Sequence, residues 1–292
     1  MHGGFFLGPH KFYESLRNMD AVERKKFCMT SVMFVNQLYG NPSLATLQRT
    51  DARYFNTCMM MTLGGAACSD GLENGKVVSG VGGQYNFVAM AHELPGARSI
   101  LMLRSTRSKH GQVTSNILSN YGQLTIPRHL RDVVITEYGI ADLRGRTDQE
   151  IVAALLNITD SRFQENLMQT AQQNGKLPRD HRIPDVFRRN LPERLTDQLS
   201  GSKAQGLFPA FPFGTDLTNI EIVLGKALQA LKSKLGRPGG AAKATVRALE
   251  VRTVPEAAAP YLERMGLEAP RNLKEKMVRK MLVAELIAEG VV

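Results

Sequence analysis

A glycine-rich turn between a β-rich segment and a helical pattern constrains the fold of this 292-residue chain most strongly. Residues 77–79 lead into the loop GVGG at 80–83, and apolar residues of helical spacing follow it. Glycine permits positive φ and close approach of a ligand to the backbone, and the first turn of a helix leaves N–H groups unpaired. The loop therefore predicts a turn that aims amides at a phosphate or a developing oxyanion. A turn that uses glycine for packing alone is the alternative.

Length and composition place the chain among ordinary globular proteins. With 292 residues, 43% hydrophobic and 22% charged, it can form one large domain or two modest ones. It has no apolar run of about 18 residues that could span a bilayer and no signal-peptide pattern. We therefore expect a cytoplasmic location and no membrane partner.

The three cysteines do not form a metal or disulfide pattern. Cys28, Cys58 and Cys68 lack paired spacing, so neither a disulfide framework nor a zinc site is expected. We expect them to be small buried hydrophobic residues, and we expect no metal.

The net charge of +10 favours a polyanionic partner, such as nucleic acid, an acidic membrane or a phosphorylated cofactor. The densest basic stretch, residues 176–194, also contains acidic residues and prolines, which indicates a solvated surface rich in loops. No zinc-finger spacing, RNP-type aromatic pair or basic zipper is present. A nucleic-acid partner is therefore not expected.

Apolar and β-branched runs predict strands, and capped apolar patterns predict helices. Strands are expected over residues 31–35, 54–63, 76–79, 99–104, 113–118 and 132–136. Helices are expected over residues 86–93, after a cap at Thr147, over 161–173, from a cap at Thr218 to 235, and over 272–289. Strands that alternate with helices indicate an α/β fold.

Proline and glycine divide the second half of the chain. Residues 178–212 are punctuated by proline and are expected to be irregular, and residues 236–252 have the composition of a flexible linker. We therefore predict an α/β domain over 1–215 and a helical extension over 216–292.

Glu137 stands where an apolar strand pattern gives way to a loop. In open α/β sheets ligands collect at the carboxyl ends of strands, so this carboxylate could act as a base, orient a substrate or accept a hydrogen bond. A glutamate that caps a neighbouring turn is the alternative. Asp142 and Arg144, slightly downstream, are expected to pair with each other, and we assign them no role in the site.

Three further polar residues are candidates. Asn56 lies within an apolar run, where a buried amide must find partners, either in a structural network or on a substrate. Arg107 and Lys109 follow the predicted strand 99–104 in a loop with several hydroxyl groups. A solvated turn is the simplest interpretation of that loop, and contact with the phosphates of a cofactor is the sharper hypothesis.

Two long motifs carry a resemblance to a known family. SGVGGQYNFVAMAHELPGARSILMLRSTR begins at Ser79, and ITEYGIADLRGRT begins at Ile135. In this order and spacing they resemble the C-terminal half of the acetyl-CoA hydrolase/acetyl-CoA transferase family of CoA-transferases. The resemblance runs from HGGFFLGP at the start through TDLTNIE to YLERMGL and covers nearly all of the chain. It implies a CoA-transferase-like fold of the NagB/RpiA/CoA-transferase type with a helical C-terminal extension.

The resemblance implies covalent chemistry on short acyl-CoA thioesters. A glutamate attacks the thioester, which gives an acyl-glutamyl anhydride and then a glutamyl-CoA thioester, while backbone amides stabilise the oxyanions. The resemblance places Gly82 and Gly83 opposite the thioester carbonyl and makes Asn56 and Glu137 candidate catalytic residues. The implied contacts to CoA are Gly80, Gly82, Gly83, Gln84, Arg107 and Lys109. Coenzyme A enters as a substrate with a small carboxylate, and no permanently bound cofactor is implied.

The resemblance also predicts that this chain is inactive alone. The covalent glutamate of the family lies in a Ser-Glu-Met context before HGGFFLGP, this chain lacks that segment, and Glu137 is not that nucleophile. The expected partner is an N-terminal CoA-transferase domain in cis or in trans, and a homodimer is also compatible. A truncated or mis-started frame, half of a split enzyme, and a non-catalytic CoA-binding or subunit-interaction fragment stay open. A fragment should expose apolar surface at its N-terminal end.

Overall fold

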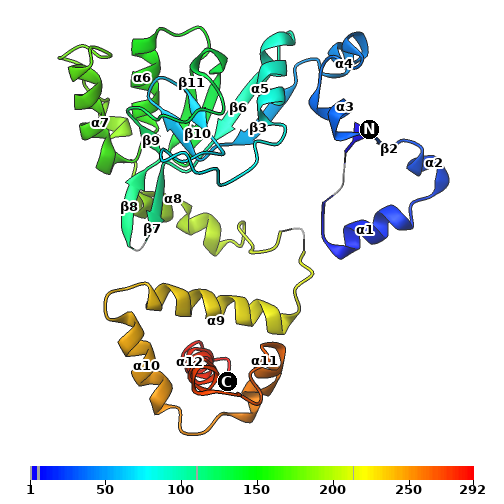
Figure 1. Cartoon of the computed structure of the whole chain (residues 1–292), viewed down its shortest axis with the longest axis vertical. Helices are drawn as coiled ribbons and strands as arrows, with labels where there is room; N and C mark the ends of the chain where they lie inside the picture. The colour runs from blue at the N-terminus through cyan, green and yellow to red at the C-terminus, as the bar shows by residue number, and fades with distance from the viewer. Residues whose placement is uncertain (1, 5–6, 110, 213) are drawn as a thin grey trace. The chain divides into compact units, whose positions relative to one another are not determined.

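The computed structural model describes residues 2–4, 7–109, 111–212 and 214–292, which form two compact units (Figure 1). The α/β unit contains residues 1–107 and 113–210, and the helical unit contains 211–292 together with the short segment 108–112. Phe5 and Phe6 of the HGGFFLGP segment lie outside the described residues. The predicted α/β class is confirmed for the first unit.

A four-stranded sheet forms the centre of the α/β unit. Its order is β11 (Gly139–Asp142), β10 (Val133–Thr136), β6 (Arg98–Met102) and β3 (Arg53–Thr57). Strands β3, β6 and β10 are parallel to one another, and β11 is antiparallel to β10. Because parallel neighbours end at the same edge of a sheet, the carboxyl ends of β3, β6 and β10 lie together.

Smaller sheets complete the strand content of the described chain. Strands β5 (Ala67–Cys68), β4 (Met60–Thr62) and β9 (Ile117–Leu118) form one sheet, β7 (Thr106–Lys109) pairs with β8 (Gln112–Ser115), and β1 (His2–Gly3) pairs with β2 (Cys28–Met29). The predicted strands 54–63 and 113–118 are thus each divided into two. Cys58 and Cys68 are buried as expected, whereas Cys28 is exposed.

Helices cover one face of the main sheet. Helix α5 (Gln84–Glu93) packs on β3 and β6, and α6 (Asp148–Asn157) and α7 (Ser161–Gln173) complete the core. Successive strand residues alternate between the two faces of a sheet, so the paired residues Leu101 and Val134 share one face. They belong to the same core cluster as Leu155 of α6. The predicted helix 161–173 is confirmed at both ends, and the predicted cap at Thr147 forms a capping box with Glu150.

The opposite face of the same sheet carries exposed apolar side chains. Phe55 of β3 is 60% exposed and Ile140 of β11 is 69% exposed. Parallel sheets in α/β proteins usually have both faces covered. This face therefore has the character of a surface that another part of a protein would cover.

Four helices precede the sheet: α1 (His10–Arg17), α2 (Ala21–Arg24), α3 (Val32–Asn36) and α4 (Pro42–Gln48). None of their described residues is buried. Leu7, Tyr39 and Leu47 are 85%, 80% and 77% exposed. The apolar surface expected at the N-terminal end is therefore present.

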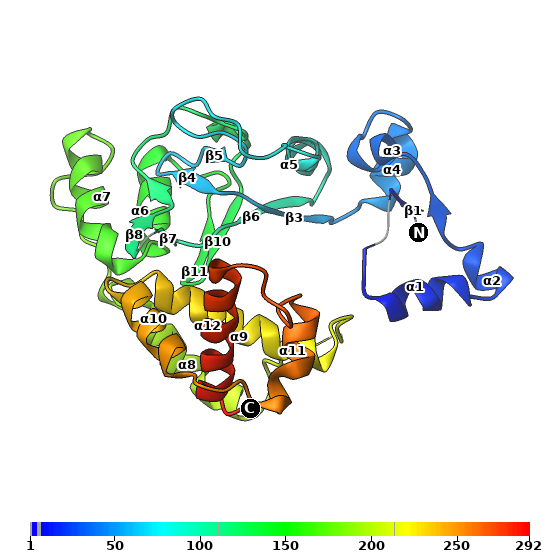
Figure 2. The same ribbon diagram turned by 60° about the horizontal axis from the view of Figure 1, so that its bottom comes forward.

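The helical unit packs its long helices around one apolar core. It contains α9 (Asn219–Leu235), α10 (Gly240–Glu250), α11 (Ala259–Arg264) and α12 (Leu273–Ala288). Figure 2 shows α12 in front of α9 and between α10 and α11. The core includes Leu224, Leu262, Leu282 and Leu286. Thr218 begins α9 with the predicted capping box to Glu221.

Two predicted strands are wrong. Residues 32–36 form helix α3, because the Oγ of Ser31 accepts a hydrogen bond from the N–H of Met33 at 3.2 Å and caps the first turn. Residues 76–79 form no strand, and Val77 makes only an isolated bridge to Gly71. The glycine loop is therefore entered from irregular backbone.

Two segments expected to be irregular are largely helical. Helix α8 (Pro192–Ala204) lies within 178–212 and starts with proline in its first turn, where the missing N–H is harmless. Helix α10 occupies the predicted linker, since Gly239 with φ of +71° turns the chain after α9 and the following residues are rich in alanine. Short 3₁₀ turns occupy Arg128–Leu130, Asp185–Phe187 and Glu256–Ala258.

Within the described ranges, no helix is long and apolar enough to cross a membrane. The same ranges contain no group of three or more His, Cys, Asp or Glu side chains that could hold a metal ion.

Candidate functional site

The glycine loop is attached to the carboxyl end of β3. The side-chain Nε2 of Gln84, the first residue of α5, donates a hydrogen bond to the carbonyl oxygen of Thr57 at 3.1 Å. Gln84 is only 7% exposed, so this link is sheltered from water. It holds the start of α5 at the edge where β3, β6 and β10 end.

The glycines of the loop differ in their surroundings. Gly82 has φ of +59°, and a Cβ added at Gly82 or Gly80 would meet nothing within 4 Å. A Cβ at Gly83 would lie 2.7 Å from Nδ2 of Asn36 and 2.9 Å from Cε2 of Phe87. Gly83 thus serves close packing, whereas the backbone at Gly80 and Gly82 is open to a ligand. Packing therefore accounts for Gly83, and the ligand-binding interpretation stays a prediction for Gly80 and Gly82.

Asn56 lies near the carboxyl end of β3, in register with Leu101 of β6. Its side-chain Nδ2 is buried and has no hydrogen-bond partner among the described residues. An unpaired buried donor costs about 1–3 kcal/mol. A bound ligand that accepts this hydrogen bond would recover that free energy.

Glu137 follows β10 at the same edge of the sheet. Its Oε2 accepts a hydrogen bond from the backbone N–H of Ser105 at 2.8 Å, and Ser105 follows β6. Ser105 is fully buried, and its Oγ accepts a hydrogen bond from the N–H of Asp160 at 2.7 Å. Glu137 itself is exposed. One carboxylate oxygen is therefore anchored to a rigid backbone.

A buried hydrogen-bonded group next to Glu137 is absent from the sequence-based predictions. The hydroxyl of Tyr138 donates to Oδ2 of Asp160 at 2.9 Å, and the guanidinium of Arg162 donates to both oxygens of that carboxylate at 2.8 and 2.7 Å. Burial opposes ionisation of Asp160, but the hydrogen bonds from Arg162 and Tyr138 hold its pKa below the usual value. Burial and the bond to Asp160 raise the pKa of Tyr138, so its hydroxyl remains a donor.

A cavity of about 260 Å³ opens beside Glu137 and Tyr138. Its wall includes the guanidinium-bearing residues Arg189 and Arg194 and the apolar side chain of Phe187. These arginines belong to the basic stretch that the sequence indicated as solvated surface. The only sequence signal for these two arginines was the density of basic residues in this stretch. That density does not predict that the stretch packs next to Glu137. The cavity therefore combines a carboxylate with two cations that can hold an anion.

The two cations predicted to contact phosphates are placed differently. Arg107 donates from Nη1 to Oδ1 of Asn116 at 2.9 Å and is exposed. Lys109 belongs to the segment 108–112, which groups with the helical unit.

The expected local pair of Asp142 and Arg144 is only partly present. The backbone N–H of Arg144 contacts Oδ1 of Asp142 at 3.3 Å, but its guanidinium bonds to Asp132 at 2.6 Å. Asp142 pairs instead with Arg98 at 2.6 Å. The two side chains thus belong to a larger network centred on Asp132, which the sequence did not indicate.

The lowered pKa of Asp160 predicts a dependence of stability on pH. A carboxyl whose pKa is lower in the folded state stabilises the fold above its unfolded pKa, and this contribution is lost as the pH falls through the folded pKa. We expect the free energy of unfolding of the α/β unit to fall below about pH 4. The D160N variant should be less stable than the parent at pH 7 and should lose less on acidification. Urea unfolding monitored by circular dichroism between pH 7 and pH 3 measures how the free energy of unfolding of the parent and of D160N depends on pH. Equal dependence on pH in the two proteins would contradict this role of Asp160.

Comparison with known proteins matches most of the α/β unit to one protein family. The family model "Acetyl-CoA hydrolase/transferase C-terminal domain" matches residues 8–171. The chain is similar to the 4-hydroxybutyrate coenzyme A transferase of Clostridium kluyveri, with 34% identity over 166 residues, 56% of this chain and 36% of that protein. It is also similar to the probable butyrate:acetyl-CoA coenzyme A-transferase of Syntrophomonas wolfei, with 33% identity over 50% of this chain and 33% of that protein.

Among solved structures, RipA from Yersinia pestis is 27% identical, with a TM-score of 0.48 over 58% of this chain and 36% of that one. The chain spans about a third of the length of the curated relatives that it matches.

Proposed function

Because the chain belongs to the acetyl-CoA hydrolase/transferase family through its C-terminal domain, we propose that it supplies part of the active site of an acyl-CoA:carboxylate CoA-transferase. The observation that carries this proposal is the buried Nδ2 of Asn56, with which no described residue pairs, at the sheet edge where Gln84 holds the open glycine loop. A buried donor without a partner at this edge suits a carbonyl oxygen that becomes an oxyanion. The proposed substrates are short acyl-CoA thioesters and small carboxylates.

The proposed reaction passes through a glutamyl-CoA thioester. A glutamate oxygen attacks the thioester carbonyl, and the C–S bond breaks. CoA departs as its thiolate, and an acyl-glutamyl anhydride remains. The thiolate then attacks the glutamyl carbonyl and releases the acyl group as its carboxylate. The acceptor carboxylate then attacks the glutamyl-CoA thioester, which releases CoA thiolate and gives a second anhydride. The thiolate attacks the acceptor's carbonyl in this anhydride, which releases the new acyl-CoA and restores the glutamate. Each addition places negative charge on a carbonyl oxygen, which Asn56 and the amides at Gly82 and Gly83 would stabilise.

Glu137 orients a reacting group in this proposal and does not attack the thioester. Its Oε2 accepts from Ser105, so the carboxylate is held against the backbone next to the cavity of Arg189 and Arg194. The bond to Oε2 fixes the orientation of this carboxylate, and a side chain of fixed orientation suits the positioning of a reacting group. In the same proposal Arg189 and Arg194 hold the anionic substrate.

We infer that the attacking glutamate belongs to an N-terminal CoA-transferase domain, in cis or in trans. The exposed sheet face of Phe55 and Ile140 supports a partner there, since a parallel sheet is normally covered on both faces. The complete fold would then be of the NagB/RpiA/CoA-transferase type. CoA would contact Gly80, Gly82, Gly83 and Gln84, with Arg107 near its phosphates. In the same proposal Lys109 approaches the phosphates of CoA.

Binding of acetyl-CoA to the purified chain tests this proposal. We expect calorimetry to show binding that the N56A and G82A variants each weaken about five- to tenfold, since each loses a donor or strains the loop. Gly75→Ala is the matched control, because Gly75 has φ of +82° and open space for a Cβ but lies outside the loop. Equal affinities for G75A and G82A would contradict the assigned site.

Turnover separates this proposal from a non-catalytic CoA-binding or subunit-interaction fragment. The chain mixed with acetyl-CoA and propionate should leave the thioester intact, as followed by chromatography of the CoA species. Addition of a separately produced N-terminal domain of a related transferase should yield propionyl-CoA. If the chain binds acetyl-CoA but gives no propionyl-CoA even with that domain, the non-catalytic fragment is favoured. Turnover by the chain alone would place the attacking glutamate within this chain.

A further inference from the structure

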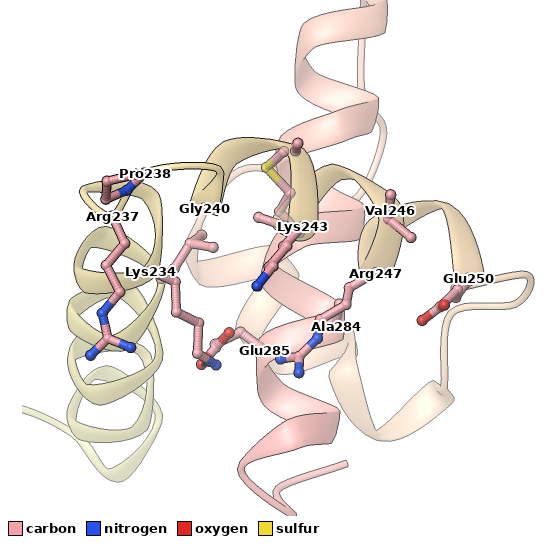
Figure 3. A pocket seen from close by; sticks show the side chains of 14 residues that line it. Lys234, Arg237, Pro238, Gly240, Lys243, Val246, Arg247, Glu250, Ala284 and Glu285 are labelled. Atoms are coloured by element: carbon pink, nitrogen blue, oxygen red, sulfur yellow. Dashed lines mark hydrogen bonds and ion pairs between the residues drawn. The ribbon is translucent and has the colours of Figure 1, made fainter.

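The helical unit contains a cleft of its own, outside residues 8–171 that match the family model (Figure 3). It lies between α9, the turn at Arg237–Pro238, α10 and α12, and its volume is about 640 Å³. Cavities of about 300–1,000 Å³ hold small organic ligands. We propose that this cleft binds an amphipathic carboxylate, namely the anion of a medium-chain fatty acid.

The walls of the cleft suit an aliphatic tail. Leu231, Val246, Met281 and Ala284 line it from three different helices. Val246 is 56% exposed although it faces the cleft, so apolar surface is left in contact with water. An alkyl chain that covers this surface would gain free energy in proportion to the apolar area removed from water.

Basic side chains on the same cleft suit an anionic head group. Arg237, Lys243 and Arg247 line it, are exposed, and make no ion pair within 4.0 Å among the described residues. Lys243 and Arg247 lie four residues apart on α10, where like charges repel each other. A carboxylate between them would relieve this repulsion and accept charge-assisted hydrogen bonds.

The acidic residues of the cleft do not oppose this ligand. Glu285 is buried at 4% exposure, and Nζ of Lys234 neutralises it at 2.5 Å. Figure 3 shows Glu285 beside the tip of Lys234, with the ends of Lys243 and Arg247 nearby, while Glu250 lies apart at the far end of α10. The pairing of Lys234 with Glu285 therefore leaves Lys243 and Arg247 available for a ligand.

Calorimetric titration of the full chain with decanoate tests the proposal. We expect saturable binding, at least about tenfold weaker binding of acetate because it lacks the tail, and at least about tenfold weaker binding of 1-decanol because it lacks the charge. The K243A/R247A double variant should lose about tenfold or more in affinity for decanoate, since it loses two charged partners of the head group. Equal affinity of the parent for decanoate and 1-decanol would overturn the proposal.

The matched control is the K226A/K232A double variant. Lys226 and Lys232 are exposed on α9, do not line the cleft, and their replacement removes the same charge. This variant should bind decanoate like the parent. An equal loss in both double variants would reduce the effect to overall charge and overturn the site. An A284F variant that keeps its helical circular dichroism should also lose binding, and unchanged affinity would place decanoate elsewhere.

Discussion

Replacement of Asp132 by alanine is expected to reduce the free energy of unfolding of the α/β unit by about 3–5 kcal/mol. The Asp132 side chain is fully buried, and it accepts hydrogen bonds from Arg98 at 2.8 Å, from Arg144 at 2.6 Å and from the backbone N–H of Ser99 at 2.7 Å. Without the carboxylate, two guanidinium groups and a buried amide lose their shared partner. The loss is costly because the N–H of the buried Ser99 is left without its acceptor, while Arg98 and Arg144, which are 28% and 36% exposed, lose a charge-assisted partner.

Asp142→Ala is the matched control for this prediction. Asp142 also pairs with Arg98, at 2.6 Å, but its side chain is 52% exposed. Its loss should cost less than about 1 kcal/mol. Urea unfolding followed by hydrogen exchange in peptides from β6 and β10 measures both variants. Similar losses for D132A and D142A would show that burial of Asp132 does not determine the effect.

Gly240→Ala is expected to destabilise the helical unit by about 3 kcal/mol. A Cβ at this position would lie 1.8 Å from the backbone oxygen of Lys234 and 2.9 Å from its carbonyl carbon. Backbone atoms cannot rotate away as a side chain does, so the end of α9 and the start of α10 would have to separate. Leu282 and Leu286 pack in the core that holds these helices, so the damage should spread through the unit.

Gly225→Ala provides the opposite expectation within α9. A Cβ there would meet nothing within 4 Å, and the position is an exposed helix interior. Alanine should therefore stabilise the unit by about 0.5–1 kcal/mol through its higher helix propensity. Hydrogen exchange in peptides from α12 reports the stability of the unit. A loss in G240A no larger than the change in G225A would contradict the close contact at Gly240.

The sequence predicted the features that depend on neighbouring residues. The caps at Thr147 and Thr218, the helix 161–173 and the strand before Glu137 were all correct in type, because capping and periodicity involve residues within a few positions of one another. The family resemblance followed from two long contiguous motifs, and the match over residues 8–171 confirms the family; the segments TDLTNIE and YLERMGL lie outside that match.

Errors arose where local composition permitted two outcomes. Residues 32–35 are apolar and include the β-branched Val32 and Val35, yet they are helical, since the cap at Ser31 outweighs strand propensity. The alanine-rich part of 236–252 resembled a linker because its helix α10 is stabilised mainly by packing against α9 and α12.

The candidate site shows the same division. Sequence alone marked Asn56 as a polar residue within an apolar run, Glu137 as a carboxylate at a strand end, and the loop at Gly82 as flexible, and their chemistry could be inferred from residue type. Only the tertiary structure decided that Nδ2 of Asn56 has no hydrogen-bond partner within the described ranges and that Ser105 holds Glu137 from 32 positions away. The same is true of Asp132, which Arg98 reaches across 34 positions. Burial and hydrogen-bond partners are set by segments remote in the chain, so no local pattern encodes them.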